Sequence, residues 1–257
     1  MKLNTTAAGP EEPSDKTPVL LVHGLFGQAR NLGVLARALS RDRKVVSVDM
    51  RNHGLSPHDP DHSYPAMAGD LARVIRDHGG RMDVVGHSMG GKAAMWLALT
   101  EGDLVRRLVV LDIAPVAYAH SQMKQIDAME GTEFTACKTR SAADAALSAR
   151  VEDPGVRAFL LQSLDLRAEP PEWRLNLPVL RERMADLTGW PGSEGMSWDG
   201  PALFLAGADS DYVLPAYEAA VFAAFPEARL ERVAGTGHWL HAEKPGEVAE
   251  AVVGFLG

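Results

Sequence analysis

A serine stands between two glycines in the segment Gly86-His87-Ser88-Met89-Gly90, a spacing that can support nucleophilic chemistry. The segment follows a short apolar run that begins at Met82 and precedes helix-compatible residues, so it predicts a turn between a strand and a helix. Glycines permit so tight a turn, and its strained backbone pushes the Ser88 hydroxyl outward. The Met89 amide would then lie at a helix N-terminus, where it can donate to a developing oxyanion. The pattern predicts a serine nucleophile.

The same residues contain a second pattern, Gly-x-x-x-x-Gly-Lys from Gly86 to Lys92, which is typical of phosphate-binding loops. Such loops also lie between a strand and a helix. They need Ser or Thr after the lysine to hold magnesium, and this chain has Ala93 there. We therefore favour a nucleophile over a nucleotide site, and also over a serine that merely lies in a glycine-rich turn.

A serine hydroxyl needs a base within hydrogen-bond reach, and the base needs a carboxylate that fixes its tautomer. On a sheet of this kind the chain order is serine, acid, histidine. The last loop before the final predicted helix contains His238 between Gly237 and Trp239. We expect His238 to be the base and His241 to support the loop or face the helix start.

Two strand ends offer a carboxylate to this histidine. Asp112 directly follows an apolar strand, is the only carboxylate there, and precedes a proline that stiffens the exit. Asp209 and Asp211 follow a later strand and could also be self-capping turn residues. Parallel strands end at one edge of a sheet, so either loop could approach His238. We favour Asp112 and keep Asp209 and Asp211 as the alternative.

The elements that must position these residues alternate along the chain. Short apolar runs predict buried strands, and apolar residues at helical spacing predict helices between them. This alternation predicts an α/β fold with a mostly parallel central sheet and helices on both faces. The expected strands are 18–22, 45–48, 82–85, 107–111, 202–206 and 229–233, and the expected helices are 31–40, 64–78, 93–99, 217–225 and 248–256.

The alternation stops in the middle of the chain, where helical patterns occur without a convincing strand. We therefore predict a first part of the core at 1–116, a helical cap insertion at 117–198 over the active edge of the sheet, and a second part of the core at 199–257. A cap turns one face to the site, so some of its bulky apolar residues would line a substrate pocket. The candidates are Met123, Phe134, Phe159 and Trp173 in the cap, with Trp239 beside His238.

The composition narrows the classes of partner. The chain has 257 residues, of which 46% are hydrophobic, enough for one sizeable core. A net charge of -8 argues against nucleic acid or an anionic membrane as partner, and we expect the short basic group Arg41, Arg43 and Lys44 to lie on a solvated face. Residues 1–15 are polar, so a cytoplasmic protein is expected. The single cysteine, Cys137, excludes an internal disulfide framework.

One histidine-rich segment raises the question of a metal site. Three histidines, His53, His58 and His62, stand near Asp59 and Asp61. Their spacing fits no regular ligand scaffold, and the prolines and aspartates of the segment are typical of a solvated loop. We therefore expect no metal.

In combination, these motifs resemble those of serine esterases of the α/β-hydrolase superfamily, over nearly the whole chain. The sequence is similar to small bacterial acyl esterases related to the mitochondrial α/β-hydrolase-domain proteins. The segments that carry the resemblance are His-Gly-Leu-Phe-Gly at 23–27, 49–56, Gly-His-Ser-Met-Gly at 86–90, Asp-Ile-Ala-Pro at 112–115, Trp-Arg-Leu-Asn-Leu at 173–177, Gly-His-Trp at 237–239 and Glu-Lys-Pro at 243–245.

The resemblance implies an α/β-hydrolase fold with a helical cap, short- to medium-chain acyl esters or thioesters as small-molecule substrates, and no cofactor. It also implies that the Leu25 amide supplies a second oxyanion donor beside Met89. Phe26 would line the pocket, and His23 would brace the loop.

The acid departs from the common pattern of the superfamily. Members commonly place it three residues beyond a glycine after the next-to-last strand. The counterpart of that glycine is Gly207, and position 210 is Ser210, with Asp209 and Asp211 on either side. The esterases that this chain resembles look like enzymes that place the triad acid at the position of Asp112.

The expected function is therefore a carboxylic-ester hydrolase that works through an acyl-enzyme. Thioesterases, carbon–carbon bond hydrolases and acyltransferases share the same Ser-His-Asp triad and stay open as alternatives, as does a ligand receptor with an idle triad. Dehalogenases and epoxide hydrolases are disfavoured because they have aspartate in the place of Ser88. The sequence has no signal for an oligomeric state.

Overall fold

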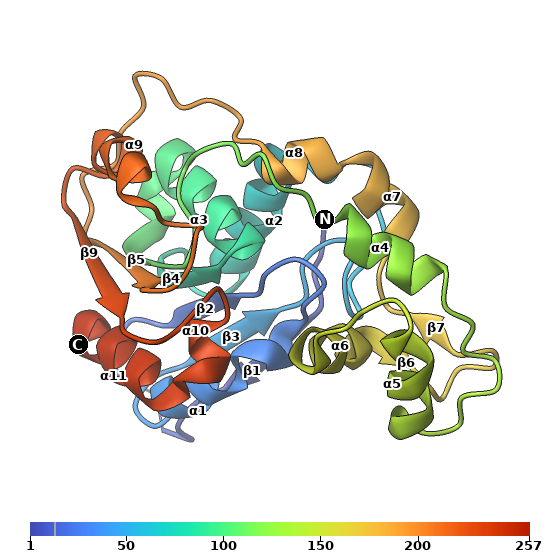
Figure 1. Ribbon diagram of the computed structural model, residues 1–257. Helices are drawn as coiled ribbons and strands as arrows, with labels where there is room; N and C mark the ends of the chain where they lie inside the picture. Colours follow the sequence, from blue (N-terminus) through green and yellow to red (C-terminus); the bar gives the residue numbers. More distant parts are fainter. Residues whose placement is uncertain (13) are drawn as a thin grey trace.

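The computed structural model describes residues 1–12 and 14–257. A seven-stranded sheet forms the centre of this part of the chain, in the order β1-β3-β2-β4-β5-β8-β9 (Figure 1). Its neighbouring strands pair in parallel, except that β1 runs antiparallel to β3. The strands are β1 (Thr5–Ala8), β2 (Val19–Val22), β3 (Val45–Val48), β4 (Met82–His87), β5 (Val105–Leu111), β8 (Ala202–Gly207) and β9 (Ala228–Val233). The predicted mostly parallel sheet is confirmed.

Helices cover both faces of the sheet, which is why most residues of its inner strands are apolar. The helices α2 (Tyr64–Asp77), α3 (Met89–Thr100) and α9 (Glu218–Ala224) contribute to one core cluster. The helices α1 (Gly33–Leu39) and α11 (Pro245–Leu256) pack in the second cluster, against the other face. These five helices agree with the predicted ones to within a few residues at each end.

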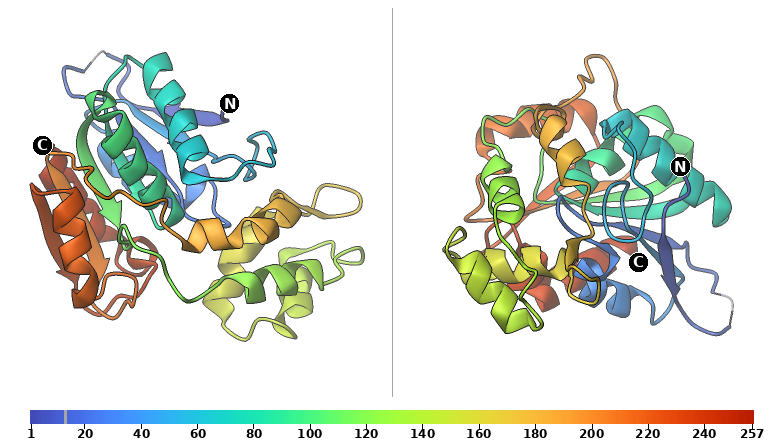
Figure 2. Two further views of the ribbon diagram at one scale, coloured as in Figure 1. Left: turned by 90° about the horizontal axis from the view of Figure 1, so that it is seen from above. Right: turned by 90° about the vertical axis from the view of Figure 1, so that its right-hand side faces the viewer.

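The segment between β5 and β8 projects beside the ends of the strands (Figure 2). Its helices are α4 (Met123–Glu130), α5 (Arg140–Ser148), α6 (Pro154–Leu160), α7 (Leu177–Glu182) and α8 (Met184–Thr188). It also contains a two-stranded ladder of β6 (Leu164–Asp165) and β7 (Glu172–Trp173). The expectation of no strand in this segment is therefore wrong. Two residues per strand are too few to produce a period-two pattern in the sequence.

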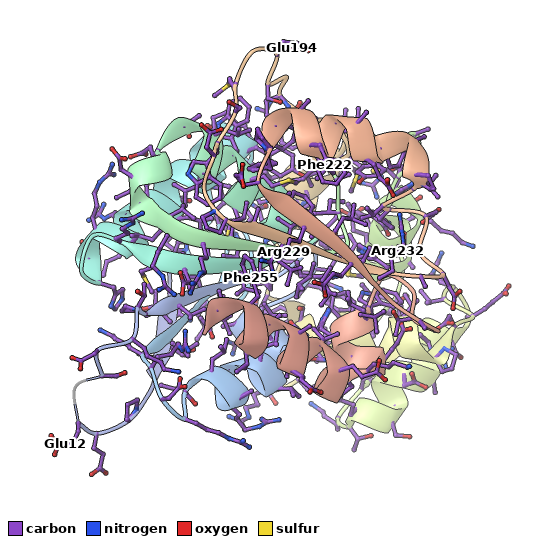
Figure 3. All side chains as sticks on the ribbon, turned by 90° about the vertical axis from the view of Figure 1, so that its left-hand side faces the viewer. Glu12, Glu194, Phe222, Arg229, Arg232 and Phe255 are labelled. Carbon is purple, nitrogen blue, oxygen red and sulfur yellow. The ribbon has the colours of Figure 1, made fainter. Side chains whose placement is uncertain are left out.

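The two edge strands of the sheet, β1 and β9, differ in their residue types. β1 has four small, exposed residues and no apolar alternation, so no strand was expected there. β9 forms the opposite edge, where Arg229 and Arg232 lie on the outer surface between α9 and α11 (Figure 3). Arg232 donates to the Val213 carbonyl at 2.8 Å and lies 3.0 Å from a carboxylate oxygen of Glu218. Charged side chains on an edge strand discourage pairing with another chain.

Short helices complete the chain. A helical turn, α10 (Leu240–Glu243), follows the histidine of the last loop and was not expected as a separate element. The 3-10 helices are η1 (Ala29–Leu32), η2 (Gly102–Leu104), η3 (Leu161–Ser163) and η4 (Pro215–Tyr217). Within the two described ranges, no helix is both long and apolar enough to cross a membrane.

Arg43 contradicts the expected solvated face. Its side chain is buried, with Nε 3.0 Å from an Asp42 carboxylate oxygen and Nη1 3.9 Å from Asp83. The guanidinium group also donates to the backbone oxygens of Leu256 and Gly257. Five fixed donors suit such a buried junction, because they can bind carboxylates and carbonyls at the same time.

Candidate active site

Ser88 lies at the sharp turn between β4 and α3. Its backbone has φ 52° and ψ -120°, outside the regions that residues other than glycine normally adopt. The flanking glycines are required by contact: a Cβ on Gly86 would lie 2.4 Å from the Gly90 carbonyl oxygen, and a Cβ on Gly90 would lie 2.4 Å from the His23 carbonyl oxygen. The turn therefore holds Ser88 in a strained conformation at the carboxyl end of a central strand.

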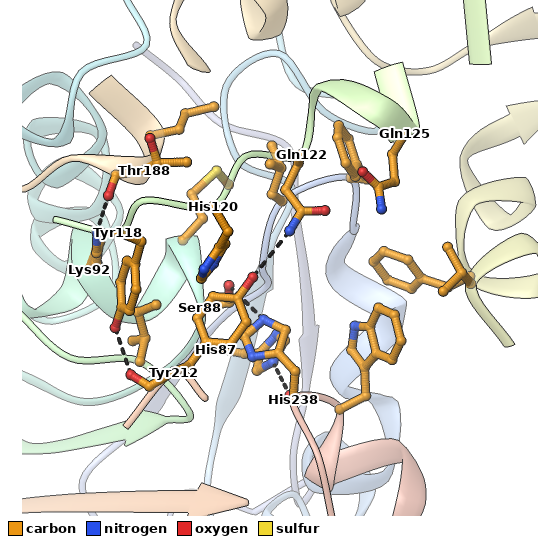
Figure 4. Close-up of a pocket in the computed structure, with 18 of the residues that line it drawn as sticks. His87, Ser88, Lys92, Tyr118, His120, Gln122, Gln125, Thr188, Tyr212 and His238 are labelled. Carbon is orange, nitrogen blue, oxygen red and sulfur yellow. Dashed lines mark hydrogen bonds between the residues drawn. The ribbon is translucent and has the colours of Figure 1, made fainter. Parts of the chain in front are cut away.

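The structure brings Ser88, His238 and Asp112 together from three loops. The Ser88 Oγ is 3.0 Å from His238 Nε2, and His238 Nδ1 is 2.8 Å from Asp112 Oδ2 (Figure 4 shows Ser88 and His238). Asp112 is buried, whereas the His238 side chain is 19% exposed. A neutral imidazole that donates from Nδ1 to Asp112 has Nε2 free to accept the serine proton. The geometry suits nucleophilic attack by Ser88.

The other carboxylates lie elsewhere. Asp209 and Asp211 are exposed, and neither contacts His238. Ser210, between them, donates from Oγ to Asp112 Oδ2 at 2.5 Å, and the Gly207 amide donates to Asp112 Oδ1 at 2.8 Å. The later strand end thus supplies donors to Asp112, and of the three candidates only Asp112 is placed to act as the acid.

Hydrogen bonds to two buried histidines, His23 and His53, support the loop after β2. The Phe26 amide donates to His53 Nε2 at 3.2 Å, and the Met50 amide donates to His23 Nε2 at 2.9 Å. His53 Nδ1 lies 2.9 Å from the Arg51 carbonyl oxygen, to which it donates. Burial lowers the pKa of His53 well below its ordinary value, so the ring is neutral and can accept. The His23 ring links the loop after β2 to the loop after β3 through its contact with the Met50 amide.

These contacts leave two amides facing the serine region. In residues 1–12 and 14–257, the Leu25 amide has no hydrogen-bond acceptor. Met89 is the first residue of α3, and a first-turn amide has no partner within its helix. Leu25, Phe26 and Met89 all line the cavity in front of Ser88. The Phe26 amide is already occupied, so Phe26 can contribute only its side chain.

The histidine-rich loop was expected to be solvated, and this is wrong for two of its histidines. His53 and His62 are buried and stack with ring centroids 5.6 Å apart. His53 accepts from the Phe26 amide in the loop that contains Leu25, and His62 packs on the His53 ring. Among the described residues, no group of three or more histidine, cysteine or acidic side chains could hold a metal ion.

A cavity of about 230 Å³ opens in front of Ser88 (Figure 4). Of the predicted pocket residues, Phe159 from α6 and Trp239 line it, and their ring centroids are 5.7 Å apart. Polar residues that were not predicted also line it. They are Tyr64, His87, Lys92, Tyr118, His120, Gln122, Gln125, Thr188 and Tyr212.

Met123, Phe134 and Trp173 are not among the residues that line this cavity, contrary to their prediction. Phe134 is buried edge-on against Trp173, with ring centroids 5.4 Å apart, and Trp173 Nε1 donates to the Met129 carbonyl at 3.1 Å. Met123 packs at the edge of the same core. Phe134 is part of the large core cluster on this side of the sheet, and Met123 and Trp173 pack against that cluster rather than line the cavity.

Lys92 does not form a phosphate-binding loop. Its Nζ donates to the carbonyl oxygens of Thr188 at 3.2 Å and Gly189 at 2.5 Å, and it lies 4.6 Å from the centre of the Tyr118 ring. Burial lowers the pKa of this amino group to about 7. Lys92 therefore ties α3 to the end of α8.

Two further neighbours of His238 were not predicted, because their positions in the sequence do not indicate a contact with it. His87 donates from Nε2 to the His238 carbonyl oxygen at 3.0 Å. The Tyr212 ring stacks on the His238 ring, with centroids 3.8 Å apart and planes 18° apart. His241 packs edge-on against His87, 4.3 Å between centroids. His87 therefore fixes the backbone of His238, and Tyr212 covers one face of its imidazole ring.

A family model described as "alpha/beta hydrolase fold" matches residues 17–245. The chain belongs to this α/β-hydrolase family. The α/β-hydrolase is 43% identical over 258 residues to esterase YbfF of Escherichia coli (strain K12), covering 100% of this chain and 99% of that protein. It is 40% identical over 249 residues to sn-1-specific diacylglycerol lipase ABHD11 of Mus musculus, covering 93% of this chain and 80% of that protein.

Solved structures agree. A marine microorganism esterase aligns with this α/β-hydrolase with a TM-score of 0.91 at 32% identity, over 99% of both chains. These relatives confirm the resemblance to serine esterases. The α/β-hydrolase is an enzyme of the carboxylesterase type.

Proposed function

We propose that this protein hydrolyses short- to medium-chain acyl esters or thioesters through an acyl-enzyme formed on Ser88. The observation that supports this most strongly is the continuous hydrogen-bonded series from Ser88 Oγ through His238 to Asp112, at 3.0 and 2.8 Å. The series faces a mainly apolar cavity, as an acyl group requires.

In the proposed mechanism, Ser88 Oγ attacks the ester carbonyl carbon while His238 Nε2 takes the serine proton. The negative charge on the carbonyl oxygen is stabilised by the amides of Leu25 and Met89. Asp112 holds the imidazole in the required tautomer and stabilises the imidazolium. The tetrahedral intermediate then collapses, and His238 gives its proton to the leaving alcohol or thiol. Water, activated by His238, releases the acid and restores Ser88.

The substrate class follows from the walls of the cavity and from the relatives. Phe159, Trp239 and the Leu25 side chain offer apolar contacts, and related proteins are named esterase and diacylglycerol lipase. We propose that residues 117–198 act as the cap that closes the cavity, that no cofactor takes part, and that the protein works in the cytoplasm.

A panel of p-nitrophenyl esters and acyl thioesters of increasing chain length tests this proposal. We expect turnover of short- and medium-chain substrates, and a loss of about four to six orders of magnitude in kcat for Ser88→Ala. Acyl transfer to an added alcohol in preference to water would favour the acyltransferase alternative. Substrate that binds without any turnover would contradict hydrolysis and favour an idle receptor.

A further inference from the structure

Gln125, in the first turn of α4, lines the cavity in front of Ser88 but takes no part in the proposed triad or oxyanion site. Its Oε1 atom is buried, and it has no hydrogen-bond partner among residues 1–12 and 14–257. A buried acceptor without a donor has lost its hydrogen bonds to water and gained none in return, so such atoms are rare in native proteins. The unpaired oxygen therefore indicates a function for this side chain.

Polar groups at other points of the cavity wall have partners within the protein. The Tyr64 hydroxyl donates to the Leu187 carbonyl oxygen at 2.6 Å. Gln122 Nε2 donates to the Tyr212 hydroxyl at 3.1 Å, and Figure 4 shows this contact, whereas no contact joins the amide of Gln125 to another residue drawn there. The Oε1 atom of Gln125 is thus available to a group that enters the cavity.

The part of the wall that belongs to α6 is apolar. Val156 and Phe159, three positions apart, share one face of this helix, and both line the cavity. Gln125 and Val156 also line a second hollow of about 230 Å³, which opens between exposed charged residues such as Arg150 and Glu152. Gln125 therefore lies where the apolar wall ends, and an acyl chain that runs along Phe159 and Val156 meets its amide.

The unpaired atom defines the group that it can bind. A side-chain carbonyl oxygen accepts hydrogen bonds, so the complementary group on an acyl chain is a donor, and a hydroxyl is the most compact one. A plain hydrocarbon chain end would leave Gln125 Oε1 buried without a partner. A site with such an atom discriminates between donor and hydrocarbon more strongly than an apolar pocket discriminates between chain lengths.

We propose that Gln125 is a specificity-determining residue whose side-chain carbonyl accepts a hydrogen bond from a hydroxyl near the end of the acyl chain. The substrate class is then hydroxyacyl esters or thioesters. This inference rests on the proposed function, since it assumes an acyl group bound in front of Ser88.

Two matched series of p-nitrophenyl esters test the proposal: straight-chain acyl esters of increasing length, and the same esters with a terminal hydroxyl. At the chain length that reaches Gln125, we expect the wild-type kcat/KM to favour the hydroxyl ester by about ten- to a hundredfold, the effect of leaving a buried acceptor without a donor. Shorter chains should show no such preference. A wild-type protein that treats both esters alike at every chain length would overturn the inference.

Gln125→Met keeps the length of the side chain and removes its acceptor, so it should reduce the preference to less than about threefold. Lys124→Met is the matched control and should keep the wild-type preference. Lys124 lies on the same helix, is exposed, and is not among the residues that line the cavity in front of Ser88. An unchanged preference in a folded Gln125→Met would also overturn the inference.

Terminal methoxy esters separate the two ends of the Gln125 amide, because an ether oxygen accepts hydrogen bonds but cannot donate one. The wild-type protein should not favour them over plain esters. A preference equal to that for hydroxyl esters would mean that Nε2 donates to the substrate, and would overturn the proposal. This comparison decides the matter without a variant, should Gln125→Met fail to fold. Absence of turnover for every ester would instead contradict hydrolysis itself, so the two failures are distinguishable.

Discussion

Ser88 and Asp112 have backbone conformations that ordinary residues avoid, with φ of 52° and 50°. Each directly follows a central parallel strand, β4 or β5, so both side chains leave the sheet at the same edge. Strain of this kind persists only where surrounding contacts enforce it, and it clusters at functional sites. The two positions and His238 between them form the chemical centre of the proposal.

The role of Asp112 can be separated from that of its neighbours. Replacing the acid with asparagine keeps its size but favours the wrong histidine tautomer, so Asp112→Asn should lower kcat by about four orders of magnitude. Asp209→Asn and Asp211→Asn should stay within about tenfold of wild type, because both side chains are exposed and do not contact His238. An inactive Asp209→Asn or Asp211→Asn beside an active Asp112→Asn would place the acid on the later strand.

At the residue scale, sequence could indicate the nucleophile and the base because each occupies a loop with its own glycine pattern. The hydroxyl of Ser210 and the ring of Tyr212 could not be inferred in the same way. Their partners are Asp112 and His238, respectively 98 and 26 positions away along the chain. Only the pairing of β5 with β8 and β8 with β9 brings these positions together.

The elements of the proposed cap differ in their relation to the cavity. Phe159 on α6 lines it together with Trp239, whereas Phe134 and Trp173 pack on each other. We expect Phe159→Ala to increase kcat/KM for longer acyl esters relative to shorter ones by about tenfold, roughly the effect of one methylene in an apolar pocket. The chain-length profile of p-nitrophenyl esters measures this ratio.

Phe134→Ala is the matched control for Phe159→Ala. It removes the same kind of side chain from the buried core, away from the cavity, so it should lower the melting temperature and keep the chain-length profile. A profile that changes with Phe134→Ala but stays fixed with Phe159→Ala would contradict the assignment of the cavity wall.

Lys92 links α3 to α8, and its buried amino group predicts a pH effect. Its pKa is about 7 in the folded protein and 10.5 in its ordinary state, so between these values the unfolded chain binds more protons. Stability therefore rises with pH in this window, by at most about 1.4 kcal/mol per pH unit. We expect wild type to gain stability relative to Lys92→Met between pH 7 and pH 10 in urea unfolding. A pH-independent difference would show that the amine is not desolvated.

At the element scale, the buried strands were predictable because both faces are covered and most of their residues are apolar. β1 could not be predicted, since its four exposed residues pair with β3 through backbone groups alone. The sequence also could not separate the residues of the proposed cap that line the cavity from those that lie in the buried core. Both roles require large apolar side chains, and only the packing of α4, α5 and α6 separates them.

At the scale of the whole molecule, the buried neutral histidines near the site make the free energy of unfolding depend on pH. His62 accepts from Asn52 Nδ2 through Nδ1, and burial lowers its pKa from 6.5 to about 3. Below pH 6.5 the unfolded chain therefore binds a proton that the folded chain does not. Stability should fall as pH decreases from 6.5 towards 3, by up to about 1.4 kcal/mol per pH unit for this group.

Urea unfolding at pH 7 and pH 5 measures this dependence. His62→Gln should lose less stability than wild type on acidification, and His58→Gln, a change at an exposed histidine, should behave as wild type. Parallel losses in wild type and His62→Gln would contradict the buried neutral histidine.

Such long-range features, like the buried Arg43 beside Asp83, depend on the assembled fold and leave no local signal in sequence.

The central claim, that Ser88 is the covalent nucleophile, is tested most directly by a fluorophosphonate probe followed by mass spectrometry of the labelled peptide. We predict one adduct, on Ser88, absent from Ser88→Ala and strongly slowed in His238→Ala because the base that activates the hydroxyl is lost. Asp211→Asn should label at the wild-type rate. Labelling that persists in Ser88→Ala, or an adduct on any other residue of the wild-type protein in place of Ser88, would contradict the account.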